Sequence, residues 1–435
     1  MTAVLAYPLP PGIPRAEHLV LVVNGTLPAI GRTPVCDYAI CAADGAVSIE
    51  VSASPGITAA AVRPAAANVQ QRIHGGRLFL ELDRPRQISI EIPGHQPLYL
   101  FVQPLATAEP SGKARVLRRL AAGRIHELGE VVLTDGEELH IEGGAVLRGW
   151  VRATGASDVR ISGHGVIDTS PLPAYYRRLM IFDRCHALDI SGITAIGSPS
   201  WTVMLGDCED VRIRGMNQIG WHVTTDGIDI VGSRRVLIED CFLRNNDDCV
   251  AIKAIGPNDS ATDRHGDFRR DVEDVLVQRC TCYNDRAGNV FEIGFETRCA
   301  AMRRITFSDC DVIGAHGEGG VFTIHNGDRA VVEDVLYEDI RIEHFYDKFI
   351  DFRVLDSRYS HEGGQGVIRR ITLRRIRAIE DLYNTASLIS GMNAAVPVSD
   401  VQLIDVRFGS RVILSSDDLH LFTRNAEDIT FSELP

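Results

Sequence analysis

Two stretches of the chain differ in how hydrophobic and polar residues follow one another. In residues 1–105, short runs with a period of two are separated by turns rich in proline and glycine. Such alternation is typical of antiparallel strands that bury one face. We therefore expect an N-terminal β-sandwich domain with strands in the following runs: His18–Val23, Val47–Val51, Arg77–Leu82, Ile88–Ile92 and Leu98–Val102.

Residues 106–123 separate these runs from the rest of the chain. Ala106–Lys113 is small, polar and interrupted by proline and glycine, which is typical of a linker. For Val116–Ala122 we expect a short helix that caps the open end of the following domain.

From about residue 124 onward a short hydrophobic motif recurs in one frame. Its last residue falls at positions 193, 216, 241, 280, 310, 340, 376 and 406, at intervals of 23 to 39 residues. The units lack helical periodicity of useful length, which disfavours leucine-rich and βαβ repeats. We therefore expect residues 124–435 to form a right-handed parallel β-helix, an all-β solenoid whose loops absorb the variation in length.

The same frame explains the cysteines. Cys241, Cys280 and Cys310 occupy a column that holds isoleucine, methionine or valine in other repeats. A column shared by these residue types indicates an interior stack in which a thiol acts as a small hydrophobic group. The alternative, a metal site, lacks a CxxC motif with partnering histidines.

A second strand in each repeat is marked by two inward apolar residues that flank one outward residue. The positions two before this pair form one column: Trp201, Asp226, Asp248, Asn289 and Gly320. Parallel strands lie about 4.8 Å apart, so Asp226 and Asp248 are expected to be neighbours, with Asp247 beside them. The polar insertion Ala254–Val272 is expected to form a wall of this cleft.

Three converging carboxylates can divide acid and base roles, which cleavage of a glycosidic bond requires. The alternative is that these aspartates occupy solvated turns, since aspartate is common before strands. The repeat frame favours the first interpretation because it brings carboxylates from different repeats to one place.

Composition and charge restrict the kind of partner. The chain has 435 residues, of which 45% are hydrophobic, and a formal net charge of −13. Its apolar runs are too short to span a membrane, and the negative charge disfavours nucleic acid and long polyanions. The N-terminus, MTAVLAYPLPPGIPRAEH, lacks the pattern of a secretory signal, so we expect a cytoplasmic protein. The sequence is compatible with a homo-oligomer and does not specify one.

Three sequence blocks resemble those of a known family. SPSWTVMLGDCEDVRIRG (198–215), TTDGIDI (224–230) and NDDCVAIK (246–253) are similar to the signature blocks of polygalacturonases, glycoside hydrolase family 28. The resemblance covers roughly residues 125–420. The related dextranase and isopullulanase family 49 shares the plan of a β-sandwich before a β-helix. The resemblance implies hydrolysis of O-glycosyl bonds in a carbohydrate substrate, with inversion of configuration and without a metal or cofactor.

Carried over to this sequence, the resemblance assigns Asp247 as the general acid that protonates the leaving oxygen. Asp226 and Asp248 would hold and activate the attacking water. Inversion requires about 6.5–9.5 Å between acid and base so that the water fits. Three crowded carboxylates also repel one another, so one of them is expected to keep its proton near neutral pH.

Two departures from the family change the expected substrate. Gly288-Asn289-Val290 stands where the family has a GHG histidine, and Thr323-Ile324-His325 stands where it has an RIK motif. The resemblance implies that the arginine and lysine of that motif bind the galacturonate carboxylate, and neither is present here. We therefore expect a neutral oligosaccharide or glycoside instead of polygalacturonate. A polygalacturonase-type pectin hydrolase is the alternative, and a cytoplasmic location favours cleavage from the chain end.

Eight residues are candidates for contact with the sugar: Trp201, Trp221, His222, Asp229, Lys253, Asn289, Glu292 and His325. The tryptophans offer faces on which sugar rings stack, and the polar groups offer hydrogen bonds. Structural alternatives stand beside these roles. Trp201 could pack in the core or at the rim, His222 could be a structural histidine, and Lys253 could face solvent.

Two other functions use the same fold. A polysaccharide lyase would eliminate across a uronate, usually with Ca²⁺, and the three aspartates would then bind the calcium. A non-catalytic carbohydrate-binding β-helix would use the cleft without turnover. Insensitivity to EDTA together with the absence of an unsaturated product would exclude the lyase, and a loss of activity in Asp247→Asn would exclude the binding protein.

Overall fold

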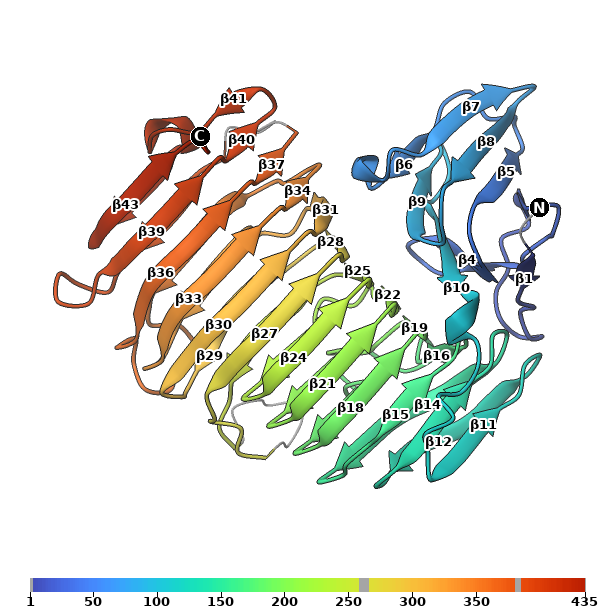
Figure 1. The fold of residues 1–435 in the computed structure, drawn as a ribbon, viewed down its shortest axis with the longest axis horizontal. Helices are drawn as coiled ribbons and strands as arrows, with labels where there is room; N and C mark the ends of the chain where they lie inside the picture. Colours follow the sequence, from blue (N-terminus) through green and yellow to red (C-terminus); the bar gives the residue numbers. More distant parts are fainter. Residues whose placement is uncertain (1–2, 258–265, 380–384, 435) are drawn as a thin grey trace.

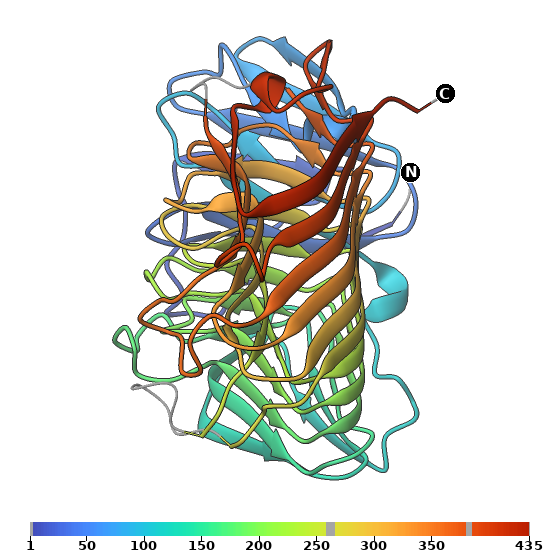
Figure 2. The same ribbon diagram turned by 90° about the vertical axis from the view of Figure 1, so that its left-hand side faces the viewer.

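A computed structural model of the protein describes residues 3–257, 266–379 and 385–434. It shows an N-terminal domain of strands beside a long parallel β-helix, so the expected all-β class is confirmed (Figure 1). Seen from its C-terminal end, the solenoid stacks its coils one behind another, with the N-terminal domain behind them (Figure 2). No helix within the described ranges is long and apolar enough to cross a membrane.

The N-terminal domain packs a six-stranded sheet against a four-stranded one. Alternate residues of its strands point inward, as the period of two predicts, and β4 and β10 are joined in parallel, so the sandwich is not purely antiparallel. Its elements are β1 (Val4–Ala6), β2 (Leu19–Val23), β3 (Ile30–Arg32), β4 (Asp37–Ala43), β5 (Val47–Ala53), β6 (Ala61–Arg63), η1 (Ala65–Ala67), β7 (Gln70–His74), β8 (Arg77–Leu82), β9 (Gln87–Glu91), β10 (Leu98–Pro104) and η2 (Leu105–Thr107).

One face of the solenoid is a 12-stranded parallel sheet, called here the outer sheet. The hydrophobic motifs that recur in the sequence are its strands, and they pair in the predicted frame. Val236, for example, is in register with Val275 on the next strand. The strands are β11 (Val116–Leu120), β13 (Glu137–Ile141), β15 (Arg160–Ser162), β18 (His186–Ser191), β21 (Glu209–Arg214), β24 (Arg234–Glu239), β27 (Val272–Gln278), β30 (Ala301–Ser308), β33 (Val331–Glu338), β36 (Val367–Arg374), β39 (Val398–Ile404) and β43 (Ala426–Ser432).

The predicted capping helix over Val116–Ala122 is wrong. Its residues 116–120 form strand β11, which pairs in parallel with β13 and begins the outer sheet. The first coil offers an open strand edge at this point, and pairing with that edge satisfies backbone groups that a single helical turn would leave unpaired. The solenoid therefore begins inside the segment predicted to be linker and cap.

The other two faces of the solenoid are parallel rows that belong to one 21-stranded sheet. Row A consists of β16 (Val166–Asp168), β19 (Thr194–Ile196), β22 (Asn217–Ile219), β25 (Phe242–Asn245), β28 (Thr281–Asn284), β31 (Asp311–Ala315), β34 (Arg341–Ile342), β37 (Arg377–Ala378) and β40 (Arg407–Phe408). Row B consists of β17 (Met180–Asp183), β20 (Val203–Gly206), β23 (Ile228–Val231), β26 (Val250–Ala254), β29 (Phe291–Thr297), β32 (Gly320–Asn326), β35 (Lys348–Val354), β38 (Ser387–Ser390) and β42 (Leu421–Arg424).

Three strands complete this sheet: β12 (Ile125–Leu133), β14 (Val146–Thr154) and β41 (Arg411–Val412). β14 is long enough to contribute to both rows, since it pairs with β16 and with β17. The loops that lead from each strand of row A to the next strand of row B stack along one edge of the solenoid. We call this edge the A–B edge.

The interior of the solenoid is apolar. All ten cysteines lie in the described ranges, and every one is a free, buried thiol. Cys241, Cys280 and Cys310 are at most 1% exposed within the main hydrophobic cluster, which confirms the predicted interior stack.

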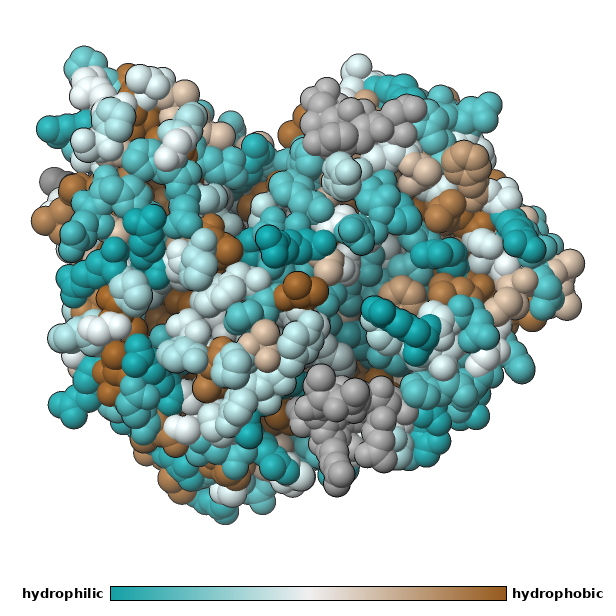
Figure 3. Space-filling view, turned by 180° about the vertical axis from the view of Figure 1, so that it is seen from behind, coloured by the Kyte–Doolittle hydropathy of each residue, from teal (hydrophilic) through white to brown (hydrophobic). Residues whose placement is uncertain are grey.

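The two domains share a second apolar core over row A. Tyr99 and Phe101 pack against Phe242 with ring centroids 5.0 and 5.3 Å apart. The hydroxyl of Tyr7 lies 2.6 Å from Nδ1 of His164 across the same boundary. The N-terminal domain is thereby fixed beside the early coils, and a notch separates it from the C-terminal coils (Figure 3).

Candidate active site

The loops of the A–B edge are in register because both rows are hydrogen-bonded along the solenoid. Val203 pairs with Ile228 and Ile228 with Val250, which places residues 201, 226 and 248 on successive strands. The backbone N–H of Gly227 donates to the carbonyl of Asp248 at 2.7 Å. The pairing continues through β29 and β32, so the predicted column is confirmed: Trp201, Asp226, Asp248, Asn289 and Gly320.

Asp226, Asp247 and Asp248 form one carboxylate cluster on this edge. An oxygen from each lies within 4.8 Å of the others. Asp226 and Asp248 are only 2% and 7% exposed, whereas Asp247 is partly exposed. Solvent therefore reaches the cluster mainly at Asp247.

The loop before β29 fits tightly around two of these carboxylates. Gly288 adopts a φ of +61°, and a Cβ at this position would lie 2.2 Å from Oδ1 of Asp247, so only glycine fits. Asn289 donates its backbone N–H to Oδ1 of Asp248 at 2.7 Å and its side-chain amide to the same oxygen at 3.1 Å. Asn289, predicted as a substrate contact, is thus buried against Asp248 and orients it.

Lys253 is the cation of the cluster. Its Nζ lies 3.0 Å from Oδ2 of Asp226, 2.9 Å from Oδ1 of Asp229 and 4.0 Å from Oδ2 of Asp248. Burial lowers the pKa of this ammonium group, but Asp226 and Asp229 outweigh burial and raise the pKa well above its usual range. The other oxygen of Asp226, Oδ1, has no hydrogen-bond partner among the described residues. That oxygen is a buried, unpaired acceptor beside a fixed positive charge.

Trp201 supports Lys253. Nζ of Lys253 lies 4.1 Å from the indole centroid, and the guanidinium carbon of Arg178 lies 3.9 Å from it. Cation–π contacts of this kind are strongest where the cation is desolvated, as both are here. Trp201 therefore contacts two buried cations and also packs, partly buried, against a small apolar cluster on row B.

The electrostatics of the cluster favour a protonated Asp247. Burial raises the pKa of this carboxyl well above its usual range, and the charges of Asp226 and Asp248 add to the effect. Burial also raises the pKa of Asp248 to about 8, against the opposing charge of Lys253. Lys253 contacts Asp226 and Asp248 but forms no ion pair with Asp247. Because the carboxylates cannot all ionise beside a single ammonium, Asp247 is the group best placed to keep a proton.

A second buried cluster of charges lies on the outward face of row B. Nδ1 of His325 lies 2.9 Å from Oε1 of Glu292, and its Nε2 lies 3.2 Å from Oδ2 of Asp351. Arg353 pairs with Asp351 at 2.5 Å. Burial lowers the pKa of His325, but Glu292 and Asp351 outweigh it and raise the pKa to about 9. Glu292 and His325 are 0% and 3% exposed, so both predicted sugar contacts are buried.

Trp221 and His222 lie in the loop that leads to Asp226. The carbonyl of Trp221 accepts a hydrogen bond from the side chain of Asn246 at 2.6 Å, and its ring packs against the core between the domains. The carbonyl of His222 accepts the backbone N–H of Thr225 at 3.1 Å. Both rings are partly exposed, so packing of the loop and contact with a ligand are compatible roles.

Three charged residues near the cluster were missed in the sequence: Arg178, Asp351 and Arg353. Asp351 and Arg353 pair with Thr323 and His325 one coil earlier, so continuing the column by one strand would have found them. Arg178 lies in the long loop between β16 and β17, which the repeat frame does not describe. Glu296 lies at the end of β29, and burial raises the pKa of its carboxyl while Lys253 opposes the rise.

Of the predicted wall Ala254–Val272, residues 258–265 lie outside the described residues. The flanking parts pack on row B, where Ile255 and Phe268 join Met204 and Val231 in a small apolar cluster. These residues cover part of the outward face of β20 and β23.

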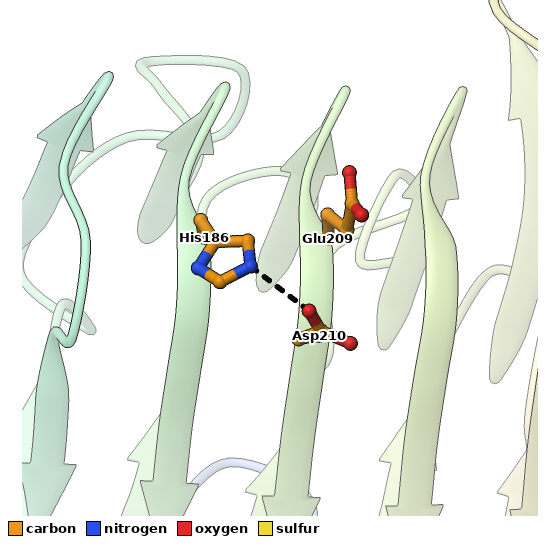
Figure 4. A group of neighbouring side chains, drawn as sticks. All are labelled: His186, Glu209 and Asp210. Atoms are coloured by element: carbon orange, nitrogen blue, oxygen red, sulfur yellow. Dashed lines mark ion pairs between the residues drawn. The ribbon is translucent and has the colours of Figure 1, made fainter.

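Two groups of side chains have atoms close enough together to hold a metal ion in the described part of the chain. The first is the carboxylate cluster, where Lys253 already supplies a positive charge. The second is His186, Glu209 and Asp210 on the outer sheet (Figure 4). There Asp210 is 2.9 Å from His186 and 2.6 Å from Arg235, so its charge is already matched by side chains.

Comparison with known proteins agrees with this arrangement. Residues 145–416 match the model of Glycosyl hydrolases family 28. A probable polygalacturonase of Arabidopsis thaliana is 28% identical over 154 residues, which cover 30% of this chain and 33% of that protein. Exopolygalacturonase A of Aspergillus niger is 33% identical over 78 residues, which cover 16% of this chain and 18% of that protein. The alignments thus span a third or less of these curated relatives.

Solved structures share the fold. Dex49A from Penicillium minioluteum superposes with a TM-score of 0.65 at 10% identity, covering 96% of each chain. A hyperthermoactive exopolygalacturonase from Thermotoga maritima gives a TM-score of 0.52 at 16% identity, covering 73% of this chain and 84% of the other. At such identities the likeness concerns the fold alone. The family model, however, covers more than half of the sequence, and the chain belongs to glycosyl hydrolases family 28.

Proposed function

We propose that the protein is a glycoside hydrolase that cleaves O-glycosyl bonds in a neutral oligosaccharide or glycoside. The observation that carries the proposal is the cluster of Asp226, Asp247 and Asp248 around one buried ammonium. It places a carboxyl that keeps its proton beside a carboxylate with an unpaired acceptor oxygen. Those are the two groups that hydrolysis of a glycosidic bond requires.

In the proposed reaction Asp247 gives its proton to the glycosidic oxygen as the bond from that oxygen to C1 breaks. A water held between Asp226 and Asp248 attacks C1, and its proton passes to Oδ1 of Asp226. One water is consumed, and the products are an alcohol and a free sugar. Until that proton transfer, the carboxylate of Asp226, paired with Lys253, faces the positive charge that develops on the sugar and stabilises it.

Inversion of configuration is part of the proposal and is supported by family membership. The spacing gives it no support, because oxygens of the three carboxylates lie within 4.8 Å. Carboxyl groups are about 6.5–9.5 Å apart in most inverting enzymes and about 5–5.5 Å apart in retaining ones. Proton NMR of the product in its first minutes should show the inverted anomer; the retained anomer would contradict this part of the proposal.

Neutrality of the substrate is supported by the charges around the cluster. The ammonium of Lys253 is paired with Asp226 and Asp229, and Arg353 is paired with Asp351. A uronate carboxylate at either place would have to displace a buried ion pair, which is costly when one charge is left unpaired. A sugar hydroxyl, in contrast, can share these groups through hydrogen bonds.

One observation favours a uronate as a second candidate substrate. Arg286 lies exposed on the loop that carries Gly288, next to Asp247, and it pairs with none of the described residues. An exposed guanidinium near the catalytic carboxylates could bind a carboxylate in a bidentate manner. The similar polygalacturonases of Arabidopsis thaliana and Aspergillus niger fit this candidate.

The test is a panel of neutral oligosaccharides and aryl glycosides run beside polygalacturonate. We expect hydrolysis in the neutral panel, loss of that activity in Asp247→Asn, and little change in Arg286→Gln. Equal or better turnover of polygalacturonate, abolished in Arg286→Gln, would overturn the neutral substrate and establish the uronate. Activity that disappears with EDTA and yields an unsaturated product would instead indicate a lyase.

Cleavage from the chain end in the cytoplasm is the remaining part of the proposal. Exopolygalacturonase A of Aspergillus niger, similar over part of the chain, supports an exo mode. An enzyme inside a cell would meet short oligosaccharides instead of large polymers. Random internal cuts in a long glycan, or recovery of the native protein outside the cell, would contradict these two points respectively.

A further inference from the structure

An exposed aromatic pair stands on the A–B edge on the N-terminal side of the carboxylates. Tyr175 and Tyr176 are 50% and 49% exposed in the loop of residues 169–179, which joins β16 of row A to β17 of row B. The loops before β20, β23 and β26 follow it along the same edge. The tyrosines therefore share one edge of the solenoid with Asp226 and Asp248.

The distance along the edge follows from the strand pairing. β17 pairs with β20, β20 with β23 and β23 with β26. With about 4.8 Å between parallel strands, the tyrosine loop lies about 10 Å from the strand of Asp226 and about 14 Å from that of Asp248. An oligosaccharide bound along the edge would reach this loop a few sugar units from the cleaved bond.

The pair is held in place although it is exposed. The guanidinium carbon of Arg177 lies 3.9 Å from the ring centroid of Trp150 and 5.1 Å from that of Tyr176. The indole N–H of Trp150 donates to Glu130 at 3.2 Å. The backbone N–H of Tyr175 donates to the carbonyl of Pro199 in the next loop at 2.7 Å. The ring of Tyr176 is thus held by its neighbours and Tyr175 by its backbone, and an exposed aromatic group that is already held loses less entropy when a ligand stacks on it.

We infer that Tyr175 and Tyr176 form a distal platform that stacks on a pyranose ring of the glycan whose bond is cleaved at Asp247. Tyrosine suits this role because it combines a flat apolar face with a hydroxyl that can bond to sugar hydroxyls. The inference rests on the proposed hydrolase function and adds a binding subsite to it. Core packing does not explain the pair, since each residue is about half exposed.

The test compares substrates of increasing length in the parent protein and in Tyr175→Ala/Tyr176→Ala. The series runs from an aryl monoglycoside to oligosaccharides of about six units of the sugar that the panel identifies. We expect kcat/KM on the longest members to fall about tenfold or more, with unchanged turnover of the aryl monoglycoside. Phe422→Ala, which removes an exposed ring on β42 far along the solenoid, is the matched control and should change neither.

The outcomes separate the platform from the function. If kcat/KM depends on substrate length in the same way in the parent and in the tyrosine variant, and Asp247→Asn is inactive, the platform is overturned. The proposed hydrolase function is then unaffected. If only oligogalacturonates are cleaved, the neutral substrate fails, and the same comparison on an oligogalacturonate series decides the platform. Equal melting temperatures of the variant and the parent would show that the loop change does not act through folding.

Discussion

The outer sheet and the A–B edge stack charged residues on successive strands in opposite ways. One column of the outer sheet alternates in sign: Asp210, Arg235, Asp274, Arg304, Asp334 and Arg370. On the A–B edge, Asp226 and Asp248 are neighbours of the same sign. The spacing between strands is the same in both places, so the difference lies in which residues the repeats present.

The pKa values show what each pattern does. On the outer sheet, hydrogen bonds from Arg304 and Arg370 lower the pKa of Asp274 and Asp334, respectively. On the edge, burial raises the pKa of Asp247 far above its usual range. Alternation on an exposed face makes each charge stabilise the next coil. Repetition of one charge in a buried place costs stability, and the proposed role of Asp247 as proton donor would account for it.

The largest expected effect is on the edge. Asp247→Asn removes the proton donor, so kcat should fall about 10²–10⁴-fold or more. The free energy of unfolding should stay equal or rise, because one of three crowded carboxylates is neutralised. Steady-state kinetics and thermal melting measure the two effects. An Asp247→Asn variant that keeps most of its activity would remove the distinction between the two regions.

Lys253→Met should have the next largest effect. The change leaves Asp226 and Asp229 buried without their cation, and breaking a buried pair by removing one partner costs about 3–5 kcal/mol. Activity should fall as well, because the ion pair that holds Asp226 in place is lost. Chemical denaturation gives the free energy of unfolding, and kinetics give the rate.

A double variant makes this prediction specific. Lys253→Met with Asp229→Asn removes one of the uncompensated charges and should regain part of the lost stability without regaining activity. A single variant Lys253→Met that is as stable as the parent would show that the ammonium does not compensate the carboxylates.

The two regions should respond to pH with opposite signs. The raised pKa of Asp248, about 8, means that the folded state binds this proton more tightly than the unfolded state. Its contribution to stability is present below the ordinary pKa near 4 and is lost as pH rises through about 8. Asp334 has a lowered pKa, so its contribution is present above that ordinary pKa and is lost as pH falls.

Melting temperatures at several pH values check this. Asp248→Asn should stabilise the protein relative to the parent more at about pH 9 than at about pH 5. Asp334→Asn should destabilise it at about pH 7 and have little effect at about pH 3. If both variants changed stability with the same sign over the same pH range, the contrast between the regions would be wrong.

The repeat frame was predictable because stacking coils require the same inward residues at the same positions. It placed Asp226 and Asp248 on adjacent strands without any structure, and its continuation by one strand would have revealed Asp351. The frame fails where loops vary in length, so Arg178 and the tyrosine pair of its loop were not found. The capping strand β11 was also missed, because its pairing depends on an open edge in the tertiary structure and not on its own sequence.

Exposure of side chains was harder to predict than register. Glu292 and His325 point outward from row B, as the period of two requires, yet they are buried. Their outward face is covered by neighbouring charged side chains and by loops whose packing the repeat pattern does not describe. Asp247, expected beside Asp226 and Asp248, is the most exposed of the three, and the repeat frame did not predict this difference in exposure.

The smallest effect is expected on the outer sheet. Arg279 is 40% exposed and pairs with Glu239 at 2.6 Å and with Asp240 at 2.9 Å. Exposed pairs of this kind contribute about 0.2–1 kcal/mol, and salt screens them. Arg279→Gln should therefore lower the free energy of unfolding slightly at low ionic strength, less at high ionic strength, and leave kcat unchanged. A loss of unfolding free energy comparable to that of Lys253→Met would mean that the outer sheet and the edge depend on their charges equally. Alternation of sign would then not distinguish a region that only stabilises the fold from the region proposed to carry the chemistry.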